Sequence, residues 1–192
     1  MSLSTPVAAA GKRLYLVGGT VRDLLIGRGD ATNVDAFDFD ATTDARPEET
    51  KKILAGWADA LWTQGERFGT IGAKKNGRVY EITTHRAEAY SPDSRKPDVA
   101  FADAIDADLS RRDFTVNALY YNIADFSIVD YVGGVEDLRA GRLRLIGDPD
   151  KRYREDPVRM LRAIRFATKL GFSLDDATLD AIPRLRQLLE DI

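Results

Sequence analysis

Hydrophobic and polar positions follow two different periods along this chain, which predicts a mixture of strands and helices. Residues 14–17 form a short apolar run typical of a strand, and residues 20–26 are predicted to form a helix that ends at Gly27. A second helix is expected over residues 47–60, because proline and two acidic residues open it. The apolar positions expected to face the core from this helix are Ile53, Leu54, Trp57 and Leu61.

Turn signals dominate the middle of the chain. Two runs with strand composition flank Asn76-Gly77, which predicts a β-hairpin. Residues 86–100 contain two prolines, mixed charges and little periodicity, so a loop is predicted there. Further along, residues 126–131 are predicted as a strand and residues 175–190 as a helix broken at Pro183.

The strand, glycine pair and helix at residues 14–26 predict an anion site. Gly18 and Gly19 place no side chain in the turn, and the helix that follows presents free N–H groups and the positive end of its dipole. Arg22, in the first turn, would add a guanidinium group to the same phosphate. The alternative is that the glycine pair is only a turn.

A pair of carboxylates follows this segment. In Asp38-Phe39-Asp40 the side chains would alternate on a strand, so Asp38 and Asp40 share one face and Phe39 points into the core. Two such carboxylates suit Mg²⁺, although a solvated strand end would carry the same residues. Together with a phosphate site in one short unit, the pair indicates nucleotidyl or phosphoryl transfer.

Composition narrows the classes of function. The chain has 192 residues, a formal net charge of −3, no cysteine and one histidine, His85. Disulfides, thiolate metal sites and multi-histidine zinc sites are therefore excluded, and no overall basic charge indicates a nucleic-acid binder that works by charge alone. Because the sequence has neither an apolar run of membrane length nor a signal-peptide pattern, we expect a soluble cytoplasmic protein without a membrane partner.

Four motifs carry a resemblance to a known family. The first, Gly-Gly-Thr-Val-Arg-Asp followed by Asp-Phe-Asp, resembles the first motif of the bacterial tRNA nucleotidyltransferase and poly(A) polymerase family. These are the class II CCA-adding enzymes of the polymerase-β-like nucleotidyltransferase superfamily. The later segments are similar to its second, third and fourth motifs in the same order: Arg-Arg-Asp-Phe-Thr at 111–115, Gly-Gly-x-x-Asp-Leu at 133–138 and Glu-Asp-x-x-Arg-x-x-Arg at 155–162.

The second motif is read as the start of an apolar helix. Paired arginines there would oppose the helix dipole, so an anionic ligand nearby would explain them better than local helix stability. The alternative is a surface network of arginine and aspartate. The resemblance implies that Arg112 contacts the nucleotide and that Asp113 and Asn117 lie near its ribose. The third motif is implied to be a hinge, although a simple turn explains its glycines equally well.

In the fourth motif, Asp156 is predicted to cap a helix that has Pro157 at its first position. Arg159, Arg162 and Arg165 recur every three residues on that helix. Aspartate can accept from an exocyclic amine while arginine donates to ring acceptors, which selects cytosine or adenine. The resemblance assigns base choice to Asp156 and Arg159, with Arg162 and Arg165 around the nucleotide and primer end. A solvated helix face is the alternative.

Glu81 interrupts the second strand of the predicted hairpin. A glutamate that faces solvent is the simple explanation. In the related family, however, this strand lies beside the Asp-x-Asp strand, so the resemblance implies Glu81 as a candidate third metal ligand. The residues 86–100 match the position of the family's flexible loop.

The resemblance implies an α/β fold, a polymerase-β-like nucleotidyltransferase head with a mixed sheet of about five strands flanked by helices. Residues 1–147 would form the head, and 148–192 the start of a helical neck; body and tail domains have no counterpart in this sequence. The implied activity is template-independent, Mg²⁺-dependent addition of C and/or A to the tRNA 3′ end from CTP and ATP, with release of pyrophosphate.

Three alternatives remain. A poly(A) polymerase differs only in specificity. A nucleotide-binding module without turnover is a second alternative, because the RNA-holding domains of the family are not represented. A small-molecule nucleotidyltransferase of the antibiotic-modifying kind would keep the Asp-x-Asp site but gives no reason for the arginines from Arg159 to Arg165. The sequence does not predict the oligomeric state.

Overall fold

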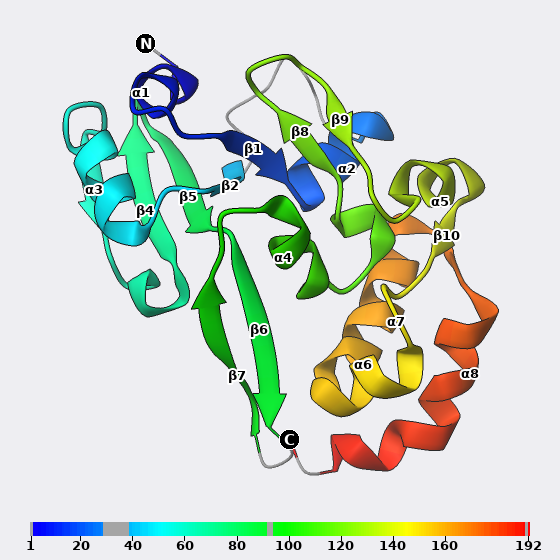
Figure 1. Ribbon diagram of the computed structural model, residues 1–192. Coiled ribbons are helices and arrows are strands. Elements are labelled where there is room, and N and C mark those ends of the chain that lie inside the picture. The colour runs from blue at the N-terminus through cyan, green and yellow to red at the C-terminus, as the bar shows by residue number, and fades with distance from the viewer. Residues whose placement is uncertain (1, 29–38, 92–93, 191) are drawn as a thin grey trace. The chain divides into compact units, whose positions relative to one another are not determined.

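The computed structural model describes residues 2–28, 39–91, 94–190 and 192 (Figure 1). The chain divides into two compact units. The first comprises Met1–Glu88, Val99–Arg111 and Leu119–Val129, and the second comprises Ala89–Asp98, Arg112–Ala118 and Asp130–Ile192.

A mixed sheet organises the first unit. Its described residues form seven strands in the order β3-β4-β5-β2-β1-β8-β9, a larger sheet than the five strands expected. β2 and β5 are parallel, and the other neighbours are antiparallel. The bounds are β1 Leu14–Val17, β2 Phe39–Thr43, β3 Ala60–Trp62, β4 Thr70–Lys75, β5 Arg78–Thr84, β8 Tyr120–Asn122 and β9 Ile128–Val129.

The predicted hairpin at Asn76-Gly77 is confirmed. β4 and β5 pair from Thr70↔Thr83 to Lys75↔Arg78, directly across this turn. Asn76 and Gly77 have φ values of 51° and 82°. Positive φ at both central residues is what a type I′ turn requires, and asparagine followed by glycine adopts it most readily.

The helices of the first unit are short. α3 begins as predicted, with Pro47 in its first turn and Glu49 accepting from the N–H of Arg46 at 2.8 Å. It ends at Ala55 rather than near residue 60, because the chain turns after Gly56 and enters β3, which leaves Leu61 half-exposed on a strand. The helical bounds are α1 Ser4–Ala9, α2 Gly19–Leu25, α3 Pro47–Ala55, η2 Glu66–Phe68 and α4 Ile105–Ser110.

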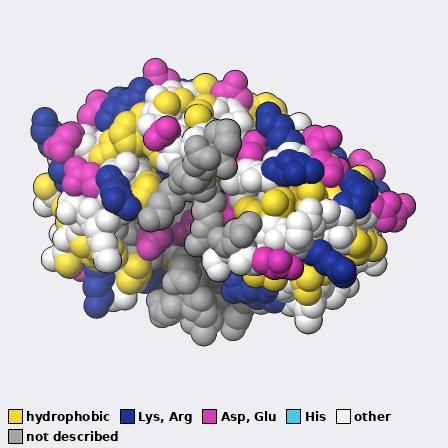
Figure 2. All heavy atoms as spheres, turned by 90° about the horizontal axis from the view of Figure 1, so that it is seen from below, with side chains coloured by type: hydrophobic (Ala, Val, Ile, Leu, Met, Phe, Trp, Pro, Cys, Tyr) yellow, Lys and Arg dark blue, Asp and Glu magenta, His cyan; other side chains and the backbone are white. Residues whose placement is uncertain are grey.

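On the face of the molecule drawn in Figure 2, basic and acidic side chains are interspersed over the described residues. This agrees with the nearly balanced charge of the chain. Within the described part of the chain, no helix has the length and hydrophobicity needed to cross a membrane.

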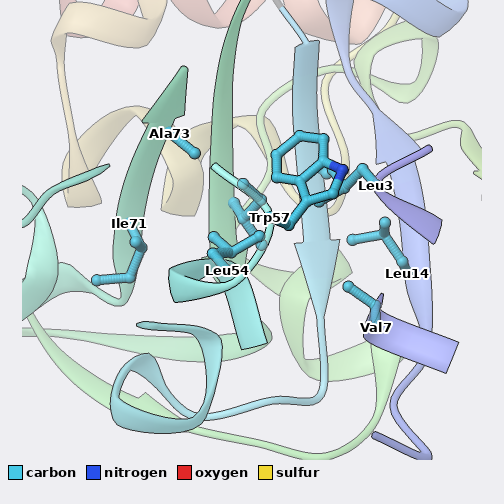
Figure 3. Packing of buried hydrophobic residues seen from close by; sticks show 9 residues of the cluster. Leu3, Val7, Leu14, Leu54, Trp57, Ile71 and Ala73 are labelled. Atoms are coloured by element: carbon cyan, nitrogen blue, oxygen red, sulfur yellow. The ribbon is translucent and has the colours of Figure 1, made fainter. Parts of the chain in front are cut away.

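The two faces of the sheet carry different side chains. On one face, Leu54 and Trp57 of the α3 region and Val7 of α1 pack against strand residues that include Leu14 and Ile71 (Figure 3). On the other face, Tyr15, Val17 and Tyr120 form a second cluster with residues of α4. Because strand side chains alternate, Asp40 lies on this second face.

Residues 86–101 correct a prediction. The expected loop is a hairpin of β6 (Arg86–Ser91) and β7 (Ser94–Phe101), which form a sheet of their own. Pro97 is compatible with a strand here, since each strand of a two-stranded sheet has an outer edge that needs no N–H donor. The mixed charges and Pro97 of this segment concealed the hairpin from sequence patterns.

The second unit is mainly helical. Pro183 lies inside α8, which runs on to Leu185 before a short 3₁₀ helix, so the predicted break at proline is wrong. In the first unit, the predicted strand at 126–131 is reduced to β9, because Phe126 has a φ of 64°. That residues 148–192 begin a neck domain stays a prediction. The elements are η3 Thr115–Asn117, α5 Gly134–Ala140, α6 Pro149–Glu155, α7 Val158–Leu170, α8 Asp176–Leu185, η4 Arg186–Leu189 and the parallel pair β10 Arg142–Leu143 and β11 Ser173–Leu174.

Candidate active site

The glycine turn in the first unit has the predicted form. β1 ends at Val17, Gly18 has φ 78° and ψ −138°, and α2 begins at Gly19. Such backbone angles are open to glycine and strained for other residues. A methyl group on Gly19 would lie 3.3 Å from Nη2 of Arg22, whose side chain is buried and donates through Nε to Asp23 at 2.8 Å. The structure thus brings Gly18, Gly19 and Arg22 together; phosphate binding there stays a prediction.

Of the two predicted catalytic carboxylates, Asp38 lies outside the described residues. Asp40 is exposed on β2 and stands in register with Glu81 of β5. In-register residues of neighbouring strands project from the same face, about 4.8 Å apart along the hydrogen-bonding direction. Glu81 therefore lies beside Asp40, as the resemblance implied. Two exposed carboxylates without nitrogen or sulfur donors suit a hard cation such as Mg²⁺, although the described residues contain no cluster of three potential ligands.

Asp40 and Glu81 begin a row of in-register residues that continues across the sheet. Glu81 pairs with Gly72 of β4, and Gly72 pairs with Trp62 of β3. The indole of Trp62 covers Gly72 so closely that any side chain at this position would collide with it. One face of the sheet therefore carries Asp40, Glu81, Gly72 and Trp62 side by side on neighbouring strands.

A pocket of about 410 Å³ opens at this row within the first unit. Trp62, Phe68, Glu81 and Arg86 are among the residues that line it. Of these four residues, the sequence indicated a role only for Glu81, because Trp62 followed a predicted helix and belonged to no motif. The signal that could have found Trp62 is its pairing with Gly72, which becomes visible only when the strands are aligned.

The second unit holds the residues of the second motif. Asp113 is buried and accepts hydrogen bonds from Asn117 Nδ2 at 3.2 Å and from the N–H of Phe114 at 2.7 Å. Arg162 donates to its other carboxylate oxygen at 2.7 Å. The backbone oxygen of Arg112 accepts from Arg152 at 2.6 Å. Asp113, Asn117 and Arg162 are thus brought together, and their roles at a ribose or primer stay predictions.

The paired arginines do not begin an apolar helix, so the predicted conflict with a helix dipole is wrong. Arg111 follows the C-terminal end of α4, where a positive charge is favourable, and its guanidinium pairs with buried Asp108 at 2.6 Å. Only the three-residue 3₁₀ helix Thr115–Asn117 follows, not an apolar helix. Local structure therefore explains Arg111 without a ligand.

The fourth motif spans the junction of α6 and α7. The carboxylate of Asp156 accepts from the N–H of Val158 at 3.2 Å, so it caps α7 from one position earlier than predicted, with Pro157 as the boundary residue. Asp156 itself is partly exposed.

The three arginines of this motif occupy different environments. Arg159 is buried and donates to the backbone oxygen of Arg152 at 2.8 Å, to Glu155 at 3.0 Å and to the hydroxyl of Tyr90 at 3.2 Å. Arg165 is exposed, 5.7 Å from the ring centre of Phe166. A three-residue step turns an α-helix by about 300°, so three such residues spread over a third of its circumference.

Positive charge is concentrated around Glu155 of the fourth motif. Arg152 and Arg159 both pair with a single carboxylate, that of Glu155. Burial lowers the pKa of the Arg152 guanidinium, and the neighbouring charge of Arg159 lowers it further. Two guanidinium groups that share one carboxylate leave a local excess of positive charge, which favours an anion or a carbonyl acceptor.

The third motif is joined to the second by a buried carboxylate. Asp137 accepts from Thr115 Oγ1 at 2.6 Å, Arg142 Nε at 2.7 Å and Arg144 Nε at 3.0 Å. Burial raises its pKa, but these donors and the charge of Arg144 outweigh that effect and hold the pKa below its ordinary value. Gly133, with φ 80°, opens α5 beside this network.

Comparison with known families decides the membership of the chain. Residues 14–144 match the family model described as the poly(A) polymerase head domain. The chain belongs to this family. The matched residues include the first, second and third motifs of the poly(A) polymerase head domain as they stand in this sequence.

Relatives in the family carry two different names. Poly(A) polymerase I of Salmonella typhi is 43% identical over 195 residues, and the match covers 95% of this chain and 40% of the relative. The CCA-adding enzyme of Lactobacillus helveticus is 45% identical over 184 residues, with coverage of 95% and 43%. The chain therefore spans less than half the length of these relatives.

Solved structures agree with this membership. The Bacillus stearothermophilus CCA-adding enzyme in complex with CTP aligns with a TM-score of 0.82 and 36% identity, covering 97% of this chain and 42% of that one. A tRNA nucleotidyltransferase with a primer tRNA and an incoming ATP analog aligns with a TM-score of 0.72 and 32% identity, covering 95% and 49%. The predicted mixed α/β head fold is confirmed.

Proposed function

We propose that this chain is the catalytic part of a template-independent RNA nucleotidyltransferase that adds C and/or A to the 3′ end of tRNA from CTP and ATP. The observation that carries the proposal is the exposed, in-register pair Asp40 and Glu81 on the sheet of a poly(A) polymerase head domain. Its substrates would be nucleoside triphosphates and the tRNA 3′ end, and a cytoplasmic location follows from these substrates.

Metal and phosphate groups have separate sites in this proposal. Asp38, Asp40 and Glu81 would hold Mg²⁺, which when bound supplies Lewis-acid activation of the primer hydroxyl and neutralises phosphate charge. Their oxygen donors fit that ion. The N–H groups of Gly18 and Gly19, with Arg22 above Gly19, would bind the triphosphate and hold it in line with the primer.

The second unit would recognise the nucleotide. Asp156 would accept from the exocyclic amine of cytosine or adenine, and Arg159 would donate to the neighbouring ring acceptor. Arg159 now donates to Tyr90, so reading a base requires that it exchange this hydrogen bond. Arg112, with Asp113 and Asn117 near the ribose, would orient the nucleotide.

The arginines of α7 would complete this arrangement. Arg162 would act as a positioning residue through its two hydrogen bonds to Asp113, and exposed Arg165 would approach the primer end. Within the whole protein, residues 1–147 would be the head and residues 148–192 the start of the neck.

Incubation with a tRNA that lacks its terminal CCA tests the proposal, using Mg²⁺ and each of the four nucleoside triphosphates in turn. We expect incorporation from CTP and ATP but not from UTP or GTP, no incorporation by Asp40→Asn, and loss of base choice in Asp156→Ala. Long adenosine tails from ATP alone would identify a poly(A) polymerase instead. Nucleotide binding without any incorporation would indicate a binding module and would overturn the proposal.

A further inference from the structure

The pocket that Glu81 helps to line has no ligand in the proposed reaction. It lies within the first unit, and its volume of about 410 Å³ is within the range typical of sites for small organic ligands. The register Asp40↔Glu81↔Gly72↔Trp62 fixes its position, because these residues form one continuous row on one face of the sheet. Whatever enters this pocket therefore lies next to the predicted metal-binding carboxylates.

The wall of the pocket suits a flat ring. Trp62 has 36% of its surface exposed, although it lies on a short strand beside the core. Gly72 leaves the space beneath the indole empty of any other side chain, so the ring lies along the sheet toward Glu81. Phe68 of η2 supplies a second aromatic surface in the same pocket.

The pocket also contains a positioned donor. Arg86 donates to the backbone oxygen of Phe68 and forms an ion pair with Glu88 at 2.8 Å. Its Nε is buried and has no hydrogen-bond partner among the described residues. A buried donor in this condition is unusual unless a ligand or ordered solvent satisfies it.

We propose that this pocket receives the 3′-terminal nucleoside of the acceptor RNA, with its base stacked on Trp62 and its ribose toward Glu81 and Asp40. The proposal rests on the proposed function. Transfer needs two substrates at the carboxylates, and the groups that would hold the incoming nucleotide are Gly19, Arg22 and the residues of the second unit. For the acceptor end, only an approach by Arg165 has been proposed, and its terminal nucleoside has no assigned site.

Stacking also fits the nature of this substrate. Single-stranded RNA is commonly held by bases stacked on aromatic side chains, a contact that tolerates any base. An acceptor end that becomes C and then A during successive additions requires this tolerance. Trp62 would therefore be a specificity determinant for a single-stranded end, not for one base.

Trp62→Ala, Trp62→Phe and Leu61→Ala test the proposal by steady-state kinetics. Leu61 is a matched control, because it is the neighbouring residue on the same strand, has the same exposed fraction of 36% and faces the opposite side of the sheet. Loss of one stacked base should raise the KM for the acceptor RNA about 5- to 150-fold in Trp62→Ala. We expect Trp62→Phe to recover most of this loss, and the KM for CTP and the activity of Leu61→Ala to stay within about twofold of the original chain.

A second measurement is independent of turnover. The chain has two tryptophans, and Trp57 is buried, so a short single-stranded RNA ending in two cytidines should quench the fluorescence of Trp62. Quenching should be absent in Trp62→Phe. RNA binding through Trp62 in a chain that incorporates no nucleotide would support this pocket while overturning the proposed transfer.

Three results would overturn the pocket assignment. These are unchanged RNA affinity in Trp62→Ala, an equal loss in Leu61→Ala, or stronger quenching by CTP alone than by the RNA. The last result would place the incoming nucleotide, and not the acceptor, against Trp62.

Discussion

Arg162 donates through both Nε and Nη2 to one oxygen of Asp113, at 2.7 and 2.6 Å. The other oxygen of Asp113 accepts from Asn117 and from the N–H of Phe114. These contacts join α7, which carries the fourth motif, to the loop of the second motif. The nucleotide-binding residues predicted in the second unit therefore share a framework, and a change at Asp113 should affect them together.

Replacement of Asp113 by asparagine tests this framework. Asparagine keeps the shape but loses the charge and turns an NH₂ group toward a donor. We expect the free energy of unfolding to fall by about 1.5–3 kcal/mol, the range for hydrogen bonds to charged groups, and the affinity for CTP to fall with it. Urea denaturation measures the first effect. Asp180→Asn, a change at an exposed residue of α8, is the control, and an Asp113 variant as stable as this control would contradict the prediction.

Asp40 and Glu81 should differ in the size of their effects. If Asp40 is a direct metal ligand, Asp40→Asn should lower incorporation more than about 100-fold, whereas Glu81→Gln should lower it about 10- to 100-fold and raise the Mg²⁺ concentration needed for half-maximal rate. Both side chains are exposed, so neither variant should lower the melting temperature. Glu48→Gln in the first turn of α3 is the control. Full activity of Asp40→Asn would exclude it as a ligand.

The lowered pKa of Asp137 predicts how the stability of the fold changes at acidic pH. Its folded-state pKa is held below the ordinary 3.8 because the donors around it outweigh the effect of burial. Its contribution is therefore complete above the unfolded-state pKa and is lost as the pH falls through the lower folded-state pKa. We expect Asp137→Asn to lower stability at neutral pH and to flatten the loss of stability below about pH 4. Urea titrations at several pH values measure this slope; an unchanged slope would refute the assignment.

The raised pKa of Tyr153 predicts that the stability of the fold falls at alkaline pH. Burial raises its pKa from 10.0 to about 12, and its hydroxyl donates to the backbone oxygen of Thr178 at 3.1 Å. Because the folded-state pKa is raised, this contribution is complete below pH 10 and is lost as the pH rises toward 12. Absorbance of tyrosinate should show one late-titrating group that disappears in Tyr153→Phe, with a loss of about 1 kcal/mol of stability at neutral pH. A titration identical in the variant would contradict this.

The features that sequence predicted best depend on local chemistry. Asn76-Gly77 encodes its own backbone angles, and Gly18-Gly19 encodes a turn between strand and helix, so both were visible without tertiary information. Glu81 was found because it is a charged residue in an otherwise apolar strand, and because the family resemblance placed that strand beside Asp40.

The features that were missed depend on pairing between distant segments. The β6–β7 hairpin is rich in charged residues and contains Pro97, so its strands carried little sequence signal. Arg111 was misread because the end of α4 at Ser110 has no glycine or proline to mark it. The link between Trp62 and Glu81 passes through Gly72, and only the alignment of three strands reveals it.

The row of in-register residues from Asp40 to Trp62 restricts how many residues can be added to the β4–β5 turn. Strand side chains alternate with a period of two, so one residue added at Asn76-Gly77 would shift β4 by one position against β5. Ile71 or Ala73, which now belong to the core, would then take the place of Gly72 opposite Glu81. An added pair of residues would leave every side chain of β4 on its own face. Changes in the length of this turn should therefore be tolerated in even steps, although the turn lies at the far end of the hairpin from Thr70 and Thr83.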